Sequence, residues 1–132
     1  MDKNIETNFV KKFISADAQS RIIYELNSKS KRKDAIQKLF DKINEKNIIF
    51  CDAKISEDEI LKKISKIYNI SSDCYIIGDS SIDGKVMNFK SAFRYVMDNA
   101  SINIIICGNE TVFIKEELSF GSSSKCLLYK KA

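Results

Sequence analysis

The chain has 132 residues, of which 44% are hydrophobic and 30% charged, and its formal net charge is +4. This length fits one domain with a sizeable core, and the composition is typical of a folded soluble protein rather than a disordered one. Because there is no histidine, Ser-His-Asp and Cys-His catalysis and most zinc sites are excluded. The 4 glycines do not have the spacing of the nucleotide-binding motifs GxGxxG or GxxxxGK(S/T).

The first third of the chain is predicted to be helical. Apolar residues recur there at the spacing of one helix face, in three successive groups. The groups are Phe9, Val10, Phe13 and Ile14; Ile22, Ile23 and Leu26; and Ala35, Ile36, Leu39, Phe40 and Ile43. Residues 1–46 are therefore interpreted as a helical N-terminal layer. They belong to the same single domain, 1–132, as the sheet-forming part, 47–132.

From residue 48 onward the pattern changes to short apolar runs, which indicate buried strands. These runs are 48–51, 74–77 and 102–107. Two helix patterns alternate with them, and each begins at a capping residue. Ser56 is the expected cap of the first, with Glu59 completing a capping box, and Asn88 is the expected cap of the second.

Strand, helix, strand, helix, strand predicts two βαβ crossovers and hence three parallel, neighbouring strands. Gly108 and Asn109 then predict a hairpin turn into an antiparallel strand at 111–114. A looser turn at 121–124 leads to a last strand at 126–129. The predicted fold class is α/β: one mixed sheet of about five strands, formed by two βαβ crossovers and an antiparallel meander, with N-terminal helices.

The cysteines are widely separated and show no CxxC spacing. They are Cys51, Cys74, Cys107 and Cys126. Each lies in or beside an apolar run, so all four are predicted to be buried free thiols. The polar start of the chain, with no apolar run long enough to cross a membrane, predicts a cytoplasmic protein.

Polar residues follow each of the three strands expected to be parallel. They are Asp52; Asp79, Ser80 and Asp83; and Asn109 and Glu110. Because ligands bind beyond the carboxyl ends of parallel strands, we expect these side chains to gather along one edge. They could form an acidic face for a basic protein partner. They could instead hold Mg²⁺ for phosphoester hydrolysis, with Lys54 or Lys85 orienting the phosphate. Ordinary loop composition is the third interpretation.

A basic run at the start of the third expected helix is a second candidate site. It contains Lys29, Lys31, Arg32 and Lys33. Clustered cations attract phosphates and nucleic acids, and their position at a helix start opposes the helix dipole. A solvated surface is the alternative, and the scarcity of arginine in the chain weakens the nucleic-acid interpretation.

The chain is small, rich in lysine and isoleucine, and of mixed α/β type. Two local features stand out in it. They are residues 21–26 together with Lys31, Arg32 and Lys33, and Asp83 with Gly84. In type it resembles the cytoplasmic immunity proteins of bacterial polymorphic and contact-dependent growth-inhibition toxin systems. The resemblance implies a protein that is not an enzyme, needs no cofactor, and binds and neutralises a cognate nuclease-type toxin domain. A Mg²⁺-dependent hydrolase and a small nucleic-acid-binding regulator remain the alternatives.

Overall fold

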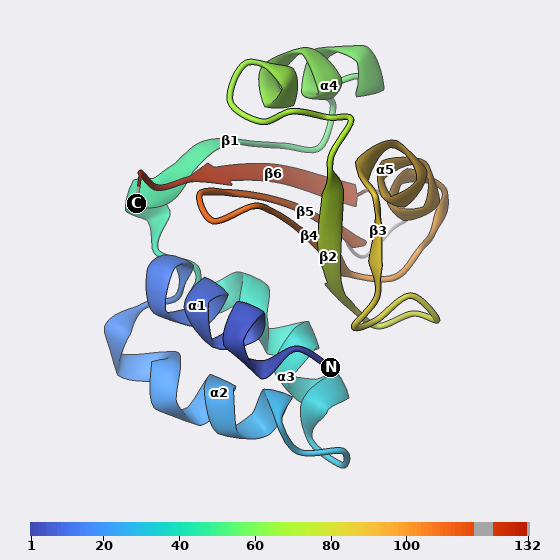
Figure 1. Cartoon of the computed structure of the whole chain (residues 1–132). Coiled ribbons are helices and arrows are strands. Elements are labelled where there is room, and N and C mark those ends of the chain that lie inside the picture. Colours follow the sequence, from blue (N-terminus) through green and yellow to red (C-terminus); the bar gives the residue numbers. More distant parts are fainter. Residues whose placement is uncertain (118–122, 132) are drawn as a thin grey trace.

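A computed structural model describes residues 1–117 and 123–131 of the chain. Six strands and two further helices follow the N-terminal helices, which confirms the predicted α/β fold class (Figure 1). In chain order they are α1 (Lys3–Phe13), η1 (Ala16–Ala18), α2 (Gln19–Leu26), α3 (Arg32–Leu39), η2 (Phe40–Lys42), η3 (Glu45–Asn47), β1 (Ile48–Asp52), α4 (Glu57–Ser65), β2 (Asp73–Gly78), β3 (Val86–Asn88), α5 (Phe89–Asp98), β4 (Asn103–Cys107), β5 (Thr111–Glu117) and β6 (Ser123–Tyr129).

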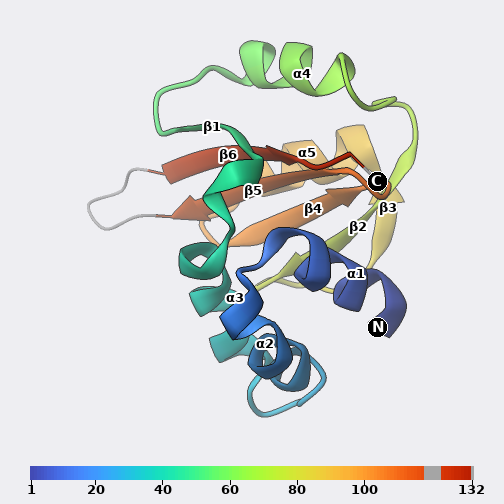
Figure 2. The same ribbon diagram turned by 90° about the vertical axis from the view of Figure 1, so that its left-hand side faces the viewer.

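The described residues form a six-stranded sheet between two helical layers. Figure 1 and Figure 2 show α1, α2 and α3 against one face of the sheet, and α4 and α5 on the other side. Each face has its own apolar core. The first contains Phe9, Phe13, Leu39, Ile77, Ile104 and Ile114, and the second contains Ile64, Phe89, Phe93, Ile76, Ile105 and Phe113. Successive side chains of β2 and β4 enter opposite cores, which explains why both strands are continuous apolar runs.

Two predicted helix caps are confirmed. Ser56 Oγ accepts a hydrogen bond from the Glu59 amide at 3.2 Å and begins α4. Asn88 Oδ1 accepts one from the Lys90 amide at 3.0 Å and begins α5. Asp2 caps α1 in the same way. Each cap satisfies an amide that the helix itself leaves without a partner.

The predicted strand directions are corrected by the structure. The sheet order is β1-β6-β5-β4-β2-β3, and each neighbouring pair is antiparallel. β1 lies beside the C-terminal strand β6, and β2 lies between β4 and the short strand β3, which was not predicted. The crossover rule assumes that a strand returns beside the one before it. Here other strands occupy those positions.

The hairpin predicted at Gly108 and Asn109 is confirmed, but its turn has three residues, 108–110, and not the two that this pair predicts. β4 and β5 pair up to Cys107 and Thr111, and Gly108 has a φ of 66°, a conformation that glycine adopts without a steric penalty. The looser turn predicted at 121–124 lies partly outside the described residues, because 121 and 122 are not among them.

Candidate functional site

The predicted acidic residues lie at both ends of the sheet instead of along one edge. Because β4 is antiparallel to β2, Asn109 and Glu110 lie at the opposite end from Asp79. Asp52 is at the same end as Asp79, but β6, β5 and β4 separate their strands. At the usual strand spacing this separation is about 19 Å. The expected gathering of carboxylates, for a partner or for Mg²⁺, is therefore wrong.

Three of the predicted residues share the loop between β2 and β3 but have different surroundings. Ser80 donates a hydrogen bond to Oδ1 of the buried Asn103 at 2.8 Å. Asp79 is half-buried, and its Oδ1 lies 3.7 Å from Nζ of Lys33, whose side chain is 69% exposed. Asp83 instead turns inward to a buried arginine. The loop thus presents one of its two carboxylates to solvent and uses the other internally.

The predicted basic run is also divided between buried and exposed positions. Arg32 is only 9% exposed, whereas Lys29, Lys31 and Lys33 are exposed. Lys31 Nζ lies 5.2 Å from the centroid of the Tyr24 ring, a cation–π contact on the surface. Arg32 is the arginine of this run that could bind a phosphate in a bidentate manner. Because it is buried, it is not available to a phosphate from solution.

Arg32 joins two carboxylates inside the protein. Its Nη1 and Nη2 donate to the two Glu6 oxygens at 2.7 Å each, and its Nε and Nη2 donate to Asp83 at 2.8 and 2.9 Å. Nη1 also donates to the Leu26 carbonyl at 2.9 Å. Burial opposes the guanidinium charge, but the hydrogen bonds to Asp83 and Glu6 outweigh it, and the pKa of Arg32 is raised. We call Glu6, Arg32, Asp83 and Tyr75 the buried cluster.

Tyr75 links the buried cluster to the start of α1. Its hydroxyl donates to Glu6 Oε2 at 2.6 Å and accepts from the Asp2 amide at 3.0 Å. On the other side, the Gly78 amide donates to Asp83 Oδ1 at 3.1 Å. Burial and the bond to Glu6 raise the pKa of Tyr75, so it remains a neutral donor. Among the described residues, no buried side-chain nitrogen or oxygen lacks a partner, which is typical of a structural network.

A cleft of about 280 Å³ opens at the end of the sheet where β2 and β5 finish. Asp79 and Glu116 line it, together with Gln37 of α3 and residues 100–102. Burial, and then the negative charge of Asp41 on η2, raises the pKa of Glu116. We call this the acidic cleft. Its two carboxylates come from segments that are distant in the sequence.

Sequence reasoning found only Asp79 of these carboxylates. β5 runs in the same direction as β2, because β4 lies between them and is antiparallel to both. The end of β5 therefore brings Glu116 to the end of β2. A signal was present, since Glu116 and Glu117 follow the strand predicted at 111–114 after one lysine, but the predicted strand order placed no other carboxylate beside them.

A second hollow, of about 230 Å³, lies between α1 and the edge of the sheet. Its lining includes Ile5, Phe9, Tyr75, Val86, Ile106 and Val112. Val86, on the edge strand β3, is 64% exposed. The predicted site residue Asn109 lies at its rim, where its carbonyl accepts a hydrogen bond from Lys12 Nζ at 2.5 Å. Apolar surface with a polar rim is a common feature of protein contacts.

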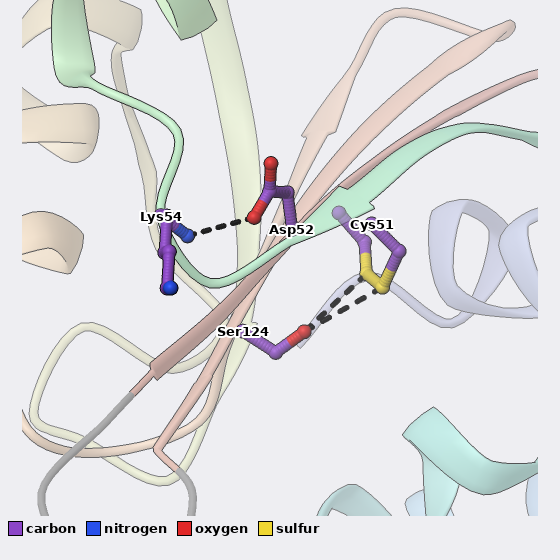
Figure 3. The surroundings of a disulfide bond; sticks show 5 residues. Cys51, Asp52, Lys54 and Ser124 are labelled. Carbon is purple, nitrogen blue, oxygen red and sulfur yellow. Dashed lines mark hydrogen bonds between the residues drawn. A yellow bond between two sulfur atoms is a disulfide. The ribbon is translucent and has the colours of Figure 1, made fainter.

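The prediction of four free thiols is corrected by a disulfide between Cys51 and Cys126 (Figure 3). The two are register partners on β1 and β6, with their Cα atoms 4.1 Å apart. Cys74 and Cys107 are buried free thiols as predicted, and burial raises the pKa of Cys74 to about 12. The disulfide was missed because its cysteines are 75 residues apart and depend on a strand pairing that was not predicted.

Comparison with protein-family models, with curated proteins and with solved structures finds no match to this chain. Within residues 1–117 and 123–131, no group of three or more Cys, Asp or Glu side chains is placed to hold a metal ion. In the same part of the chain, every helix is too short or too polar to cross a membrane. A functional proposal therefore depends on the chain's own geometry.

Proposed function

We propose that this chain is a binding protein of the immunity type, which neutralises a cognate nuclease-type toxin domain. The acidic cleft is the surface that we assign to the toxin. The observation that carries the proposal is the pair of carboxylates, Asp79 and Glu116, lining one hollow at the end of the sheet. A nuclease presents cationic side chains to the phosphates of its substrate. Carboxylates of a second protein can bind the same cationic side chains.

The electrostatics of the cleft favour the binding of a cationic side chain. Burial and the charge of Asp41 both disfavour the ionised form of Glu116, as its raised pKa indicates. A partner's lysine or arginine would relieve this repulsion. Lys33, the nearby cation of the chain itself, is 69% exposed at 3.7 Å from Asp79, and such surface pairs contribute little. It can give way to a partner.

The size of the cleft also favours a protein partner. At about 280 Å³ it lies just below the range of about 300–1,000 Å³ typical of pockets for small ligands. One long side chain of a partner fits such a hollow better than a cofactor does. We place the complex in the cytoplasm, where a nuclease toxin meets its substrate.

The test begins with the tagged protein in its native host, and with the protein encoded beside it as the candidate toxin. The purified pair is examined by surface plasmon resonance and by a nuclease assay. We expect the chain to block nuclease activity, and we expect the double variant Asp79→Asn, Glu116→Gln to slow association about tenfold, with a weaker salt dependence. A matched control, Asp17→Asn with Glu45→Gln, removes the same charge from exposed positions elsewhere.

The outcomes separate the function from the surface. If the chain neither binds nor inhibits the toxin, the immunity function is wrong. If it inhibits but the cleft variant associates at the wild-type rate, or the control variant slows equally, the acidic cleft is not the contact surface. Binding should also tighten as the pH rises through the raised pKa of Glu116, because only the ionised carboxylate attracts a cation.

A further inference from the structure

The disulfide lies at an open edge of the molecule, away from both polar sites described above. Among the described residues, β1 is the outermost strand on its side of the sheet, and its one neighbouring strand is β6. The Cys51–Cys126 disulfide joins β1 to β6, and Figure 3 shows Asp52 and Lys54 where the chain leaves β1. There the Asp52 carboxylate accepts a hydrogen bond of 2.8 Å from the Lys54 amide.

The two sulfurs differ in access. Cys51 is exposed, whereas Cys126 is only 1% exposed. A thiol from solution therefore reaches Cys51 more readily than Cys126. Exchange requires the attacked sulfur to be accessible and the other to leave as a thiolate. The exposure of the pair thus fixes the direction of the reaction.

A hydroxyl lies beside both sulfurs. Ser124 Oγ is 3.5 Å from Sγ of Cys51 and 3.9 Å from Sγ of Cys126, within the range of hydrogen bonds to sulfur (Figure 3). A hydroxyl in this position can donate to the sulfur that carries negative charge as the disulfide opens. This gives the buried leaving sulfur a donor that solvent cannot supply.

The other two cysteines are unsuited to such exchange. Cys74 and Cys107 are buried, and burial is the main cause that raises the pKa of both thiols. A buried thiol that stays protonated is a poor nucleophile. Among the cysteines, reactivity is thus concentrated in the Cys51–Cys126 pair.

We propose that Cys51 and Cys126 form a reversible thiol–disulfide exchange site that locks the edge strand β1 to β6. The reductant is a dithiol. Its thiolate attacks Sγ of Cys51, the disulfide breaks, and Cys126 leaves as a thiolate that takes a proton. The dithiol's second thiolate attacks its own sulfur in the mixed disulfide and releases Cys51. The dithiol is oxidised to a disulfide and the protein gains two thiols. A disulfide of the same class reverses the reaction.

Reduction of the disulfide removes the covalent link between the end of β1 and β6. What remains is the ladder to β6, whose register is irregular between Ile48 and Phe50, the packing of those two side chains on the two cores, and a hydrogen bond of 2.9 Å from Lys125 Nζ to the Ala53 carbonyl. An edge strand that pairs on one side opens locally more often than a central strand that pairs on both. Reduction therefore acts on β1 and leaves β4 unchanged.

The first experiment counts thiols and uses dithiothreitol as the dithiol. Protein purified without reductant should label at two cysteines after denaturation, because Cys51 and Cys126 are joined. Treatment of the native protein with dithiothreitol should raise the count to four. If four thiols label before reduction, or if the disulfide is reduced only after unfolding, the proposal is wrong.

The second experiment measures amide hydrogen exchange in the two redox states. Amides of β1, at 48–52, should exchange about tenfold faster after reduction, while those of β4, at 103–107, should not change. The variant Cys51→Ser should match the reduced wild type and lose all response to dithiothreitol. Unchanged exchange in β1, or a response that persists in Cys51→Ser, would overturn the proposed lock. Ser124→Ala should slow native-state reduction about threefold, which tests the donor separately.

Discussion

The buried cluster and the acidic cleft draw on the same loop, yet they treat negative charge in opposite ways. In the cluster, Glu6 and Asp83 accept six hydrogen bonds from Arg32, Tyr75 and Gly78, and they share the positive charge of Arg32. In the cleft, Asp79 has only a weak pair with the exposed Lys33, and the charge near Glu116 that affects its pKa is the negative one of Asp41. The first arrangement holds elements together, and the second leaves charge for a partner.

The comparison shows what decides the role of a carboxylate in this loop. Asp79 and Asp83 are neighbours in sequence and chemically identical, but the chain turns between them so that only Asp83 reaches Arg32. Membership of an acidic segment is therefore a poor guide to function. Substitutions that treat the two sites alike should give very different results.

The largest effect is expected for Arg32→Met. It leaves Glu6 and Asp83 buried without their shared counter-charge, and breaking such a pair costs about 3–5 kcal/mol. The free energy of unfolding, measured by urea denaturation, should fall by this amount. Lys33→Met is the control on the cleft side, and it should change stability by less than about 0.5 kcal/mol. A loss below about 1 kcal/mol for Arg32→Met would show that the cluster is not structural.

Asp83→Asn and Asp79→Asn make the comparison within one loop. Asp83→Asn weakens charged hydrogen bonds to Arg32 and one bond to the Gly78 amide, and should cost about 1.5–3 kcal/mol. Asp79→Asn should stay within about 0.5 kcal/mol, because its carboxylate is partly solvated. Thermal and urea unfolding of both variants measure the difference. Equal losses would mean that the two carboxylates are equivalent.

Tyr75→Phe removes one hydroxyl from the buried cluster. The Glu6 oxygen and the Asp2 amide then lose a partner, which should cost about 1–2 kcal/mol in the free energy of unfolding. Tyr24→Phe is the matched control, since Tyr24 is 63% exposed and its ring contact with Lys31 does not need the hydroxyl. The prediction fails if both variants unfold at the same urea concentration.

The sequence predicts those features that depend on local interactions. Caps such as Ser56 and Asn88 and the turn at Gly108 involve residues a few positions apart, so residue type alone identifies them. Apolar residues at helical spacing and continuous apolar runs likewise identified the helices and most strands. These features follow from backbone geometry that does not depend on which strand lies beside which.

The candidate sites depend on strand order, which local patterns do not encode. Glu116 joins Asp79 only because β4 lies between β5 and β2. Cys51 meets Cys126 only because β6 takes the position beside β1. Arg32 was grouped with three lysines as a phosphate-binding or solvated run, and only tertiary packing shows that it is buried.

The smallest expected effect on the free energy of unfolding is that of Glu116→Gln in the acidic cleft. In the folded protein the pKa of Glu116 is raised above its ordinary value of 4.5, so the native state holds this proton more tightly than the unfolded state. Stability therefore falls as the pH rises from the ordinary value through the raised one, and stays lower above it. Glu116→Gln should abolish this fall and stabilise the protein at neutral pH by up to about 0.5 kcal/mol.

Glu45→Gln, at an exposed position on η3, removes the same charge outside the cleft and should leave the fall in place. Urea denaturation at a series of pH values compares the two variants with the wild type. A substitution that raises stability while weakening the toxin complex would mark Glu116 as a residue kept for binding rather than for folding, in contrast to Asp83. If Glu116→Gln instead destabilises the fold, the carboxylate has a structural role, and the difference between the cleft and the buried cluster disappears.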